Sequence, residues 1–348
     1  MRAVADGRLT APMPRLPPIP ETILVAPDSF KGTFTSGEVA AALGRGLERA
    51  GRPVDLCPVA DGGEGTLAVL LDALGGELVA TTVEDPLGRP VEAAFGLVED
   101  VRARRLVAIV EMASASGLTL VDERDRDPIA ASTFGTGELI AAAVAAGAQT
   151  VYLGVGGSAT TDGGAGALRA IDRTGGLGDA RLVVLCDVRT VFEEAARIYG
   201  PQKGATPEQV RRLTRRLRDL ARRLPRDPRG VPMTGAAGGL AGGLWAELGA
   251  ELVPGAAFTL DLLEFDARMR AAHAVVTGEG RLDQQSLAGK AVSEVATRCR
   301  QSGVPCHAVT GERELDAFGA RILDLQAMLE AQTLRGLEAA GRRLAELV

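Results

Sequence analysis

Three of the 39 lysine and arginine residues in this 348-residue chain are lysines, which leaves 36 arginines. They are Lys31 in the stretch SFKG, Lys203 in PQKG and Lys290 in AGKA, and each stands beside a glycine. Lysine carries a compact ammonium that acts as a point charge, whereas arginine carries a flat guanidinium fork. Because the chain uses arginine almost everywhere else, we expect these three positions to need a compact point charge. Such a charge is suited to binding a phosphate group.

Carboxylates, hydroxyls and glycines gather in the loops that follow predicted strands. The richest loop is GVGGSATTDGGAG at residues 154–166, with six glycines. Such a loop exposes backbone N–H groups to an anion, and carboxylates in neighbouring loops suit Mg²⁺. Taken singly, a glycine-rich loop is more often a turn and an acidic residue more often a cap. The candidates are Asp28, Ser29, Asp61, Gly63, Glu64, Gly156, Gly157, Ser158, Thr160, Asp162, Asp187, Glu279, Arg281 and Asp283.

Together with the lysines, this set fits phosphoryl transfer, in which catalysis is mostly positioning and electrostatic stabilisation. Ligands of open parallel sheets sit at the carboxyl ends of the strands, where all these loops are predicted to lie. We therefore expect separate stretches of chain to meet at one cleft, where the three ammonium groups surround the terminal phosphate of a nucleotide.

Two nucleotide-binding motifs can be compared with the chain. Residues 32–37 do not form a P-loop, because Glu38 stands where GxxxxGK[ST] requires lysine. The dinucleotide fingerprint GxGxxG/A is met by Gly154, Gly156 and Ala159 after a predicted strand. This match leaves open a nicotinamide-dependent oxidoreductase of a small hydroxy acid. A two-lobed anion-binding protein that closes over its ligand is the non-enzymatic alternative.

The elements that must position these loops alternate between strands and helices. Apolar runs at 22–27 and 54–60 are predicted strands, and a helix is expected to begin after Thr35, where Glu38 completes a capping box. Residues 77–113 instead contain successive strand-rich segments around a DPLGRP turn, which predicts antiparallel pairing. Helix–strand alternation then resumes, which indicates a parallel sheet.

This order predicts an α/β protein in which a second α/β domain with a mixed sheet is inserted into a parallel-sheet domain. The predicted parallel-sheet domain is discontinuous and comprises residues 21–74 and 270–348. The inserted domain comprises residues 75–269. Residues 1–20 contain five prolines and no long apolar run, so we predict a disordered N-terminal extension.

The composition excludes several classes of function. A net charge of −6 argues against nucleic-acid binding, and the basic stretch 211–224 is predicted to be a surface helix with a Thr206–Gln209 capping box. The four cysteines are scattered, which favours buried thiols of a reducing compartment over a disulfide framework or zinc site. We find no membrane-spanning run or signal peptide, so we expect a cytoplasmic protein without a membrane partner.

Ten motifs follow one another in a fixed order over residues 23–310. They are APDSFKG, PVADGGEGT, DPLG, EMASASGL, TFGTGELI, GVGGSATTDGGAG, CDV, GPQKGAT, GAAGGLAGG and VVTGEGRLDQQSLAGK. This series resembles the bacterial type I glycerate kinase family. The resemblance implies phosphorylation of D-glycerate with ATP and Mg²⁺, giving 2-phosphoglycerate in preference to 3-phosphoglycerate. It also implies a Rossmann/flavodoxin-like domain with an inserted second α/β domain and an active site between them.

The chain also departs from the pattern of the family it resembles. Thr161 stands where the family usually has asparagine, and Arg189 and Thr190 follow CDV where Asp-Asn-Pro is usual. The segments at 167–181 and after residue 311 are short for the family. The altered sequence after Asp187 bears on the role expected of that aspartate and its neighbours.

On the kinase hypothesis, Asp187 and Asp283 are the candidates for two roles. One is the base that accepts the hydroxyl proton, and the other is the Mg²⁺ ligand. Lys31 and Lys290 are expected to hold phosphate charge.

The other candidates are assigned to substrate or nucleotide binding. Ser158 and Thr160 are expected to cradle an anionic group, and Arg281 to bind the glycerate carboxylate through its planar fork. Lys203 joins this binding group with the remaining loop residues. The predicted partners are therefore small molecules, D-glycerate and ATP, and a homodimer is left open.

Overall fold

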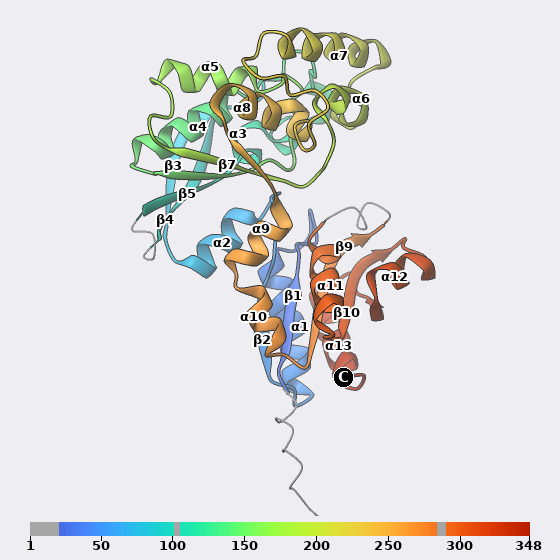
Figure 1. Cartoon of the computed structure of the whole chain (residues 1–348). Coiled ribbons are helices and arrows are strands. Elements are labelled where there is room, and N and C mark those ends of the chain that lie inside the picture. Colours follow the sequence, from blue (N-terminus) through green and yellow to red (C-terminus); the bar gives the residue numbers. More distant parts are fainter. Residues whose placement is uncertain (1–20, 101–104, 284–289) are drawn as a thin grey trace, which may run out of the picture.

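The computed structural model describes residues 21–100, 105–283 and 290–348, which form two separate β-sheets (Figure 1). One sheet is wholly parallel and has the strand order β11-β10-β9-β1-β2. Its strands come from the two ends of the chain. They are β1 (Ile23–Pro27), β2 (Val54–Leu56), β9 (Ala274–Leu282), β10 (Cys306–Arg313) and β11 (Leu325–Glu330).

Helices cover both faces of the parallel sheet, because its central strands are apolar on both sides. Every residue of β1 is buried, as expected for a strand of a parallel sheet covered on both faces. One face packs against α1 (Ser36–Arg49) and α13 (Leu334–Ala345). The other face packs against α10 (Phe265–Arg270), α11 (Ala291–Ser302) and α12 (Ala317–Leu323).

The second sheet is mixed and has the order β3-β4-β5-β6-β7-β8. Strands β3 to β5 pair antiparallel, and β5 to β8 pair parallel. All of its strands lie between β2 and β9 in the sequence, so the predicted fold class, a parallel-sheet domain with an inserted mixed-sheet domain, is confirmed. The strands are β3 (Glu77–Glu84), β4 (Pro90–Asp100), β5 (Arg105–Glu111), β6 (Thr150–Gly154), β7 (Arg181–Cys186) and β8 (Glu251–Pro254).

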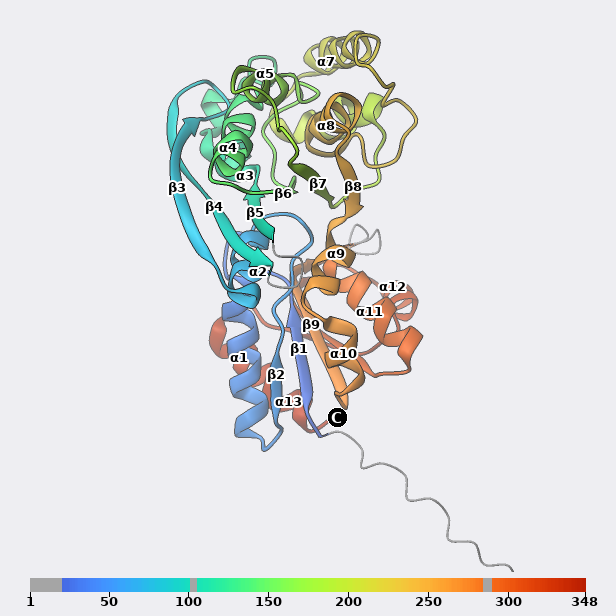
Figure 2. The ribbon, with the colours of Figure 1, turned by 60° about the vertical axis from the view of Figure 1, so that its left-hand side comes forward.

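The two faces of the mixed sheet are covered differently. Four helices bury one face in the largest core of the molecule, and two others form a smaller core beyond them. The opposite face packs against α2 (Thr66–Leu74) and α9 (Gly255–Leu262), which lie between the two sheets (Figures 1 and 2). The helices on the first side are α3 (Ala113–Ser116), α4 (Phe134–Ala145), α5 (Ala165–Arg173), α6 (Ala195–Tyr199), α7 (Pro207–Ala221) and α8 (Leu240–Leu248).

The packing of α2, α9 and α10 bears on the predicted domain boundaries. Leu70 of α2 packs against Val98 and Ile109 of the mixed sheet, although α2 precedes the predicted boundary at 75. Phe265 and Met269 of α10 belong to the core of the parallel sheet, although they precede the predicted boundary at 270. The boundaries remain predictions, and we propose that α2 and α9 serve both domains.

Local signals in the sequence begin the helices where they were expected. Thr35 and Glu38 form the predicted capping box of α1, and Thr206 and Gln209 form that of α7. The four cysteines are free and buried, as predicted. Within the described residues, no helix is both long and apolar enough to cross a membrane.

Candidate active site

The carboxyl ends of strands from both sheets meet at a layer of glycines. Gly62 and Gly63, in the loop after β2, lie against Gly156, which follows β6. The Gly156 N–H donates a hydrogen bond to the Gly62 carbonyl at 3.3 Å. A Cβ added to Gly156 would lie 2.5 Å from the Gly63 Cα, so this close approach requires glycine. The loops that the sequence singled out after β2 and β6 are therefore in contact.

An ion pair between Lys31 and Asp61 lies at this junction. Lys31 Nζ is 3.3 Å from Asp61 Oδ2; the side chain of Asp61 is 2% exposed, whereas that of Lys31 is 52% exposed. The Asp61 charge is the largest influence on Lys31 and raises its pKa above the ordinary value. Lys31 is therefore a permanent positive charge that is anchored on one side and open to a ligand on the other.

Asp28 adds a second buried carboxylate beside this pair. Its Oδ1 accepts a hydrogen bond from the Ser29 N–H at 2.6 Å. Burial raises the pKa of Asp28 well above its usual value, the charge of Asp61 raises it further, and Lys31 opposes both. Two carboxylates thus share one nearby ammonium, and additional positive charge would stabilise their ionised forms.

Asp187, directly after β7, extends the cluster into the inserted domain. Its pKa is raised by burial and then by the charge of Asp61, and it is lowered by Lys31 and Lys290. Charges of the parallel-sheet domain therefore act on a carboxylate of the inserted domain. This coupling supports a single site between the two sheets.

Lys203 is held inside the inserted domain. Its side chain is only 2% exposed, and Nζ donates hydrogen bonds to Ser158 Oγ at 2.7 Å and to the Thr160 carbonyl at 2.6 Å. Burial lowers the pKa of Lys203 to about 7, although the charges of Asp162 and Asp187 act in the opposite direction. The charge of Lys203 can therefore change near neutral pH.

Asp162 has a structural environment, although it was predicted to bind substrate or nucleotide. Its carboxylate accepts hydrogen bonds from the Thr133 N–H and hydroxyl and from the N–H groups of Gly164 and Gly166. These bonds join the loop after β6 to the beginnings of α4 and α5. We propose that Asp162 fixes the shape of the loop and leaves ligand contact to its neighbours.

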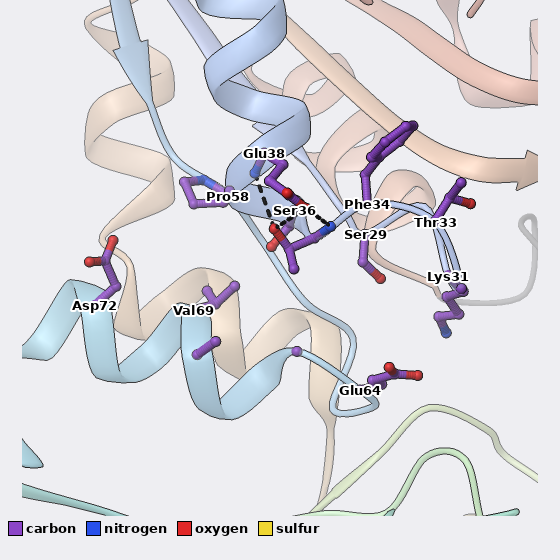
Figure 3. Close-up of a pocket in the computed structure, with 15 residues that line it drawn as sticks. Ser29, Lys31, Thr33, Phe34, Ser36, Glu38, Pro58, Glu64, Val69 and Asp72 are labelled. Atoms are coloured by element: carbon purple, nitrogen blue, oxygen red, sulfur yellow. Dashed lines mark hydrogen bonds between the residues drawn. The ribbon is translucent and has the colours of Figure 1, made fainter. Parts of the chain in front are cut away.

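Three cavities open around this cluster. The first, of about 610 Å³, lies between the loop that joins β1 to α1, together with the first turn of α1, and the beginning of α2, with Lys31 and Glu64 both in its wall (Figure 3). The second, of about 480 Å³, lies on the other side of the same loop, and Lys31 lines it together with Lys290. The third, of about 260 Å³, is lined by Ser158, Asp187 and Lys203.

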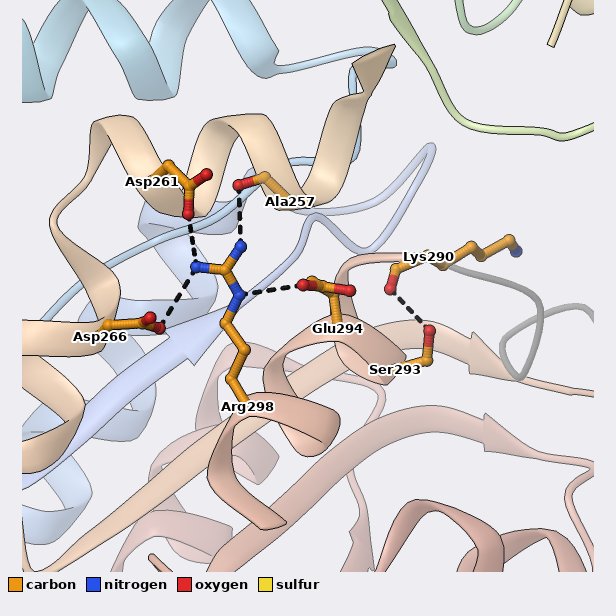
Figure 4. Close-up of polar contacts among 7 residues, drawn as sticks. All are labelled: Ala257, Asp261, Asp266, Lys290, Ser293, Glu294 and Arg298. Atoms are coloured by element: carbon orange, nitrogen blue, oxygen red, sulfur yellow. Dashed lines mark hydrogen bonds and ion pairs between the residues drawn. The ribbon is translucent and has the colours of Figure 1, made fainter. Parts of the chain in front are cut away.

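Lys290 is positioned by the beginning of α11. Its backbone carbonyl accepts a hydrogen bond from Ser293 Oγ at 3.0 Å, and its side chain extends away from the helix (Figure 4). About two turns further along α11, Arg298 pairs with Glu294 at 2.9 Å and with Asp261 of α9 at 2.7 Å. This network joins α11 to the helix that lies between the sheets, and so fixes the base from which Lys290 reaches the second cavity.

The remaining predicted residues lie around the two larger cavities. Glu279 is buried in the wall of the second cavity, where Arg281 also lies, at 2.5 Å from Glu314. Glu64 is exposed at the first cavity, and Asp283 follows β9 directly. The charge of Asp283 acts on Arg281, which lines the second cavity, so Asp283 lies near that cavity.

The structure therefore divides the predicted lysine cluster. Lys31 and Lys290 line one cavity, as a shared phosphate site requires, whereas Lys203 lines another. Asp187 connects the second and third cavities electrostatically. Lys31 and Lys290 lower the pKa of Asp187, and the charge of Asp187 raises the pKa of Lys203. Thr160 is fully buried, and its hydroxyl has no hydrogen-bond partner among the described residues.

Several lining residues were missed in the sequence. Tyr199 and Gln202 stand next to Lys203 in the third cavity, and their signal was their place within or next to GPQKGAT. Ala237 and Gly238 close the same cavity with φ angles of 51° and 64°. A Cβ on Gly238 would lie 2.0 Å from the Thr160 carbonyl oxygen, so the glycine-rich GAAGGLAGG motif has a packing reason.

Comparison with known proteins agrees with this geometry. The model of the glycerate kinase family matches residues 23–175 and 172–343. "Glycerate kinase" of Halalkalibacterium halodurans is 39% identical over 93% of this chain and 97% of its own length. "Glycerate 2-kinase" of Escherichia coli is 36% identical over 83% of this chain and 84% of its own. A crystal structure named as a glycerate kinase 2 of Salmonella typhimurium LT2 has a TM-score of 0.79 and 33% identity, and covers 94% of this chain and 98% of that one.

The fold has two sheets, with lysines and carboxylates where the loops at their strand ends meet, and its relatives are named as kinases. These findings define the class as an α/β phosphotransferase. Within that class, the chain belongs to the glycerate kinase family. The family resemblance predicted from the sequence is confirmed.

The two alternatives to a kinase are wrong. In a dinucleotide fingerprint the helix opens at the glycine motif, but α5 begins only at Ala165, well after Ala159. Gly156 is needed for contact with Gly63 instead. Family membership also identifies an enzyme that transfers a phosphoryl group, which excludes a nicotinamide oxidoreductase and a simple binding protein.

Proposed function

We propose that this chain transfers the γ-phosphoryl group of ATP to the 2-hydroxyl of D-glycerate and so produces 2-phosphoglycerate. The observation that carries this proposal is the charge cluster between the sheets, where Asp187 is within the electrostatic influence of Lys31, Lys290 and Asp61. A relative 36% identical to this chain is named glycerate 2-kinase, which supports the choice of the 2-hydroxyl.

The second cavity is the proposed place of the triphosphate. Lys31 and Lys290 bring two ammonium groups to its wall, and Arg281 adds a guanidinium. Ser29 also lines it, and the Ser29 hydroxyl is buried without a hydrogen-bond partner among the described residues. A phosphate oxygen would satisfy that hydroxyl and both ammonium groups.

Asp187 is the proposed general base. Its raised pKa makes it a better proton acceptor than an ordinary carboxylate, which suits a base that works near neutral pH. In the transfer, Asp187 accepts the hydroxyl proton while the substrate oxygen forms a bond to the γ-phosphorus. The bond between the γ-phosphorus and the bridging oxygen breaks, and ADP leaves with that electron pair. Lys31 stabilises the charge on the transferred group.

The carboxylates also fit Mg²⁺, which commonly uses one or two carboxylates together with phosphate oxygens and water. The described residues contain no group of three or more His, Cys, Asp or Glu side chains suited to a metal, so a cage made only of protein is not formed there. Asp28 and Asp61 would hold the ion, because their surplus negative charge lies beside Lys31. Bound there, Mg²⁺ would neutralise charge on the phosphates. Asp187 and Asp283 are the candidate Mg²⁺ ligands expected from the sequence, and that assignment remains a prediction.

The product can be assigned with substrates that carry a single hydroxyl. ADP release is measured with D-glycerate, L-glycerate, glycolate and tartronate, and the product from D-glycerate is identified by phosphorus NMR. (R)-Lactate offers only the 2-hydroxyl and 3-hydroxypropionate only the 3-hydroxyl. We expect 2-phosphoglycerate, and turnover of lactate but not of 3-hydroxypropionate. Formation of 3-phosphoglycerate would overturn the regiochemistry, and absence of ADP release with every acid would overturn the proposed activity.

A cytoplasmic location and a homodimer remain predictions.

A further inference from the structure

The third cavity is a small, open site whose lining residues all belong to the inserted domain. Its volume of about 260 Å³ lies below the roughly 300–1,000 Å³ typical of drug-sized ligands. The two cavities beside Lys31 are about twice as large, at about 480 and 610 Å³. A nucleotide would therefore bind in the larger spaces, and a compound of three or four carbons fits the smaller one.

The positive charge in this cavity comes from Lys203. An ammonium has three N–H donors, and among the described residues two of them are used, by Ser158 Oγ and the Thr160 carbonyl. Both acceptors are neutral, and no carboxylate in the described parts of the chain forms an ion pair with Lys203. A buried charge is normally paired, so the third donor direction of Lys203 is suited to an anion supplied by a ligand.

Neighbouring groups complete an anion site. Ser158 Oγ accepts its bond from Lys203, which leaves its own proton for donation to a ligand. The backbone N–H groups of Gly157 and Ser158 have no acceptor among the described residues. Successive N–H groups of this kind form an anion-binding concavity. Leu118, Val155 and Val188 supply an apolar wall for the carbon atoms of the ligand.

We propose that the third cavity is the acceptor subsite, in which Lys203 Nζ and Ser158 Oγ bind the carboxylate of a short 2-hydroxy acid and Asp187 lies at its hydroxyl. This assignment rests on the proposed function and deepens it. It also gives the carboxylate-binding role to Lys203 in place of Arg281, which is exposed and already paired with Glu314 at 2.5 Å.

The arrangement also gives the reaction a direction. Asp187 lines the third cavity, and the charges of Lys31 and Lys290 act on it from the second. A hydroxy acid anchored at Lys203 therefore presents its hydroxyl toward the γ-phosphate held by the other two lysines. The three lysines serve one reaction from two cavities.

The scarcity of lysine makes the proposal directly testable, because a protein labelled with ¹³C at lysine Cε gives three signals. Each signal is assigned from the one that disappears in Lys31→Met, Lys203→Met or Lys290→Met. D-Glycerate is then added without nucleotide, and ADP is added to a separate sample. We expect D-glycerate to shift the Lys203 signal, and ADP to shift those of Lys31 and Lys290. A Lys203 signal that is unmoved by saturating D-glycerate would overturn the subsite. This readout needs no turnover, so it separates failure of the subsite from failure of the proposed activity.

Kinetics provide a second test. Removal of a hydrogen bond to a charged group commonly weakens binding by about 10- to 100-fold, so Lys203→Met should raise KM for D-glycerate by that factor. KM for ATP should change by less than about twofold. Discrimination between D-glycerate and its neutral amide should fall with the loss of the ammonium, a change that a merely structural lysine would not produce. Arg212→Met, which removes an exposed cation of α7, is the matched control and should leave all three values unchanged.

Ser158→Ala keeps the test informative if Lys203→Met does not fold. It removes the hydroxyl beside the ammonium and should raise KM for D-glycerate by roughly threefold to tenfold. Unchanged KM for D-glycerate in a folded Lys203→Met or Ser158→Ala protein, checked by circular dichroism, would contradict the proposal. A rise that appears equally in the KM for ATP would also contradict it.

Discussion

Lys31 and Lys203 are the same residue type in two contrasting environments, one in each domain. Lys31 is 52% exposed and pairs with a buried carboxylate, whereas Lys203 is 2% exposed and bonds to a hydroxyl and a carbonyl. The pKa of Lys31 is raised chiefly by Asp61, and that of Lys203 is lowered chiefly by burial. An opposite charge and desolvation therefore move the same ammonium in opposite directions.

This difference teaches how each lysine can contribute. Lys31 keeps its charge at every physiological pH, which suits stabilisation of a phosphoryl group that is negative throughout transfer. Lys203, with a pKa of about 7, is only partly charged at neutral pH, and an anion bound beside it would favour its charged form. The first lysine is a permanent electrostatic element, and in the proposed subsite the charge of the second is coupled to binding of the acid.

Asp187 is the point at which the two environments meet, and its removal should have the largest effect. Asp187→Asn keeps the size of the side chain but cannot accept a proton, so kcat should fall by about 10²- to 10⁴-fold. The pKa of Lys203 should also fall below its wild-type value, because the charge of Asp187 raises it. Steady-state kinetics and the ¹³C-lysine signals measure the two effects. Asp219→Asn on exposed α7 is the control, and a kcat within about twofold of wild type in Asp187→Asn would exclude the base role.

Lys31→Met should have the next largest effect. It removes the permanent charge beside the phosphoryl group, and loss of one preorganised electrostatic contact typically lowers kcat by about 10²- to 10³-fold. Asp61 would lose its partner in a buried position, so some loss of thermal stability should accompany it. Stopped assays of ADP release and a thermal melt give both values. If Lys31→Met raises KM for D-glycerate more than Lys203→Met does, the division of labour between the lysines is wrong.

The pH dependence of stability should separate the two environments further. Below pH 7 folded Lys203 carries a buried charge, and between its folded pKa of about 7 and the ordinary value of 10.5 the unfolded chain binds more protons. The free energy of unfolding should therefore rise with pH between about 7 and 10.5, by up to roughly 1.4 kcal/mol per pH unit. Asp162, Asp187 and Tyr199 are the ionisable groups beside Lys203, and all three are present in both the wild type and Lys203→Met.

Urea unfolding at pH 6.5 and pH 9.5 measures this linkage. The stability of the wild type relative to Lys203→Met should be lower at pH 6.5 than at pH 9.5 by a few kcal/mol. Lys31→Met should show no such gain between these pH values, because the raised pKa of Lys31 lies above the window. A constant difference between wild type and Lys203→Met would show that the buried lysine does not titrate near neutrality.

The alternation of elements and their caps could be predicted from the sequence because both are local signals. The capping boxes at Thr35 and Thr206 depend on residues three positions apart. The side on which α2 packs could not be predicted in this way. It depends on contacts of Leu70 with strands far along the chain, and its own sequence shows only an apolar helix.

The same limit applies to the site. Loops at strand ends identified Lys31, Asp61 and Asp187 because topology brings such loops together. The role of Asp162 depends on donors from Thr133, 29 residues earlier, and the pairing of Arg281 depends on Glu314, 33 residues later. No spacing rule predicts either contact. The division of the lysines between two cavities likewise depends on how the domains meet.

The smallest expected effects come from the N-cap residues that end the two lysine loops, the segments that carry Lys31 and Lys203. Thr35 caps α1 and accepts a hydrogen bond from the Glu38 N–H at 3.2 Å. Thr206 caps α7 and accepts one from the Gln209 N–H at 3.3 Å. Thr35→Ala and Thr206→Ala should each lower the free energy of unfolding by about 1 kcal/mol, measured in urea.

The kinetic effects of these two variants should differ in kind. Thr35 ends the segment whose residues Lys31, Thr33 and Phe34 line the proposed triphosphate cavity, so Thr35→Ala should raise KM for ATP by about twofold to threefold. Thr206 follows Lys203, so Thr206→Ala should raise KM for D-glycerate by a similar factor. Thr333→Ala removes the comparable cap of α13, outside both lysine loops, and should lower stability without changing either KM. If all three variants affect both substrates equally, the caps act through general loosening of the fold, and the two lysine loops do not serve separate substrates.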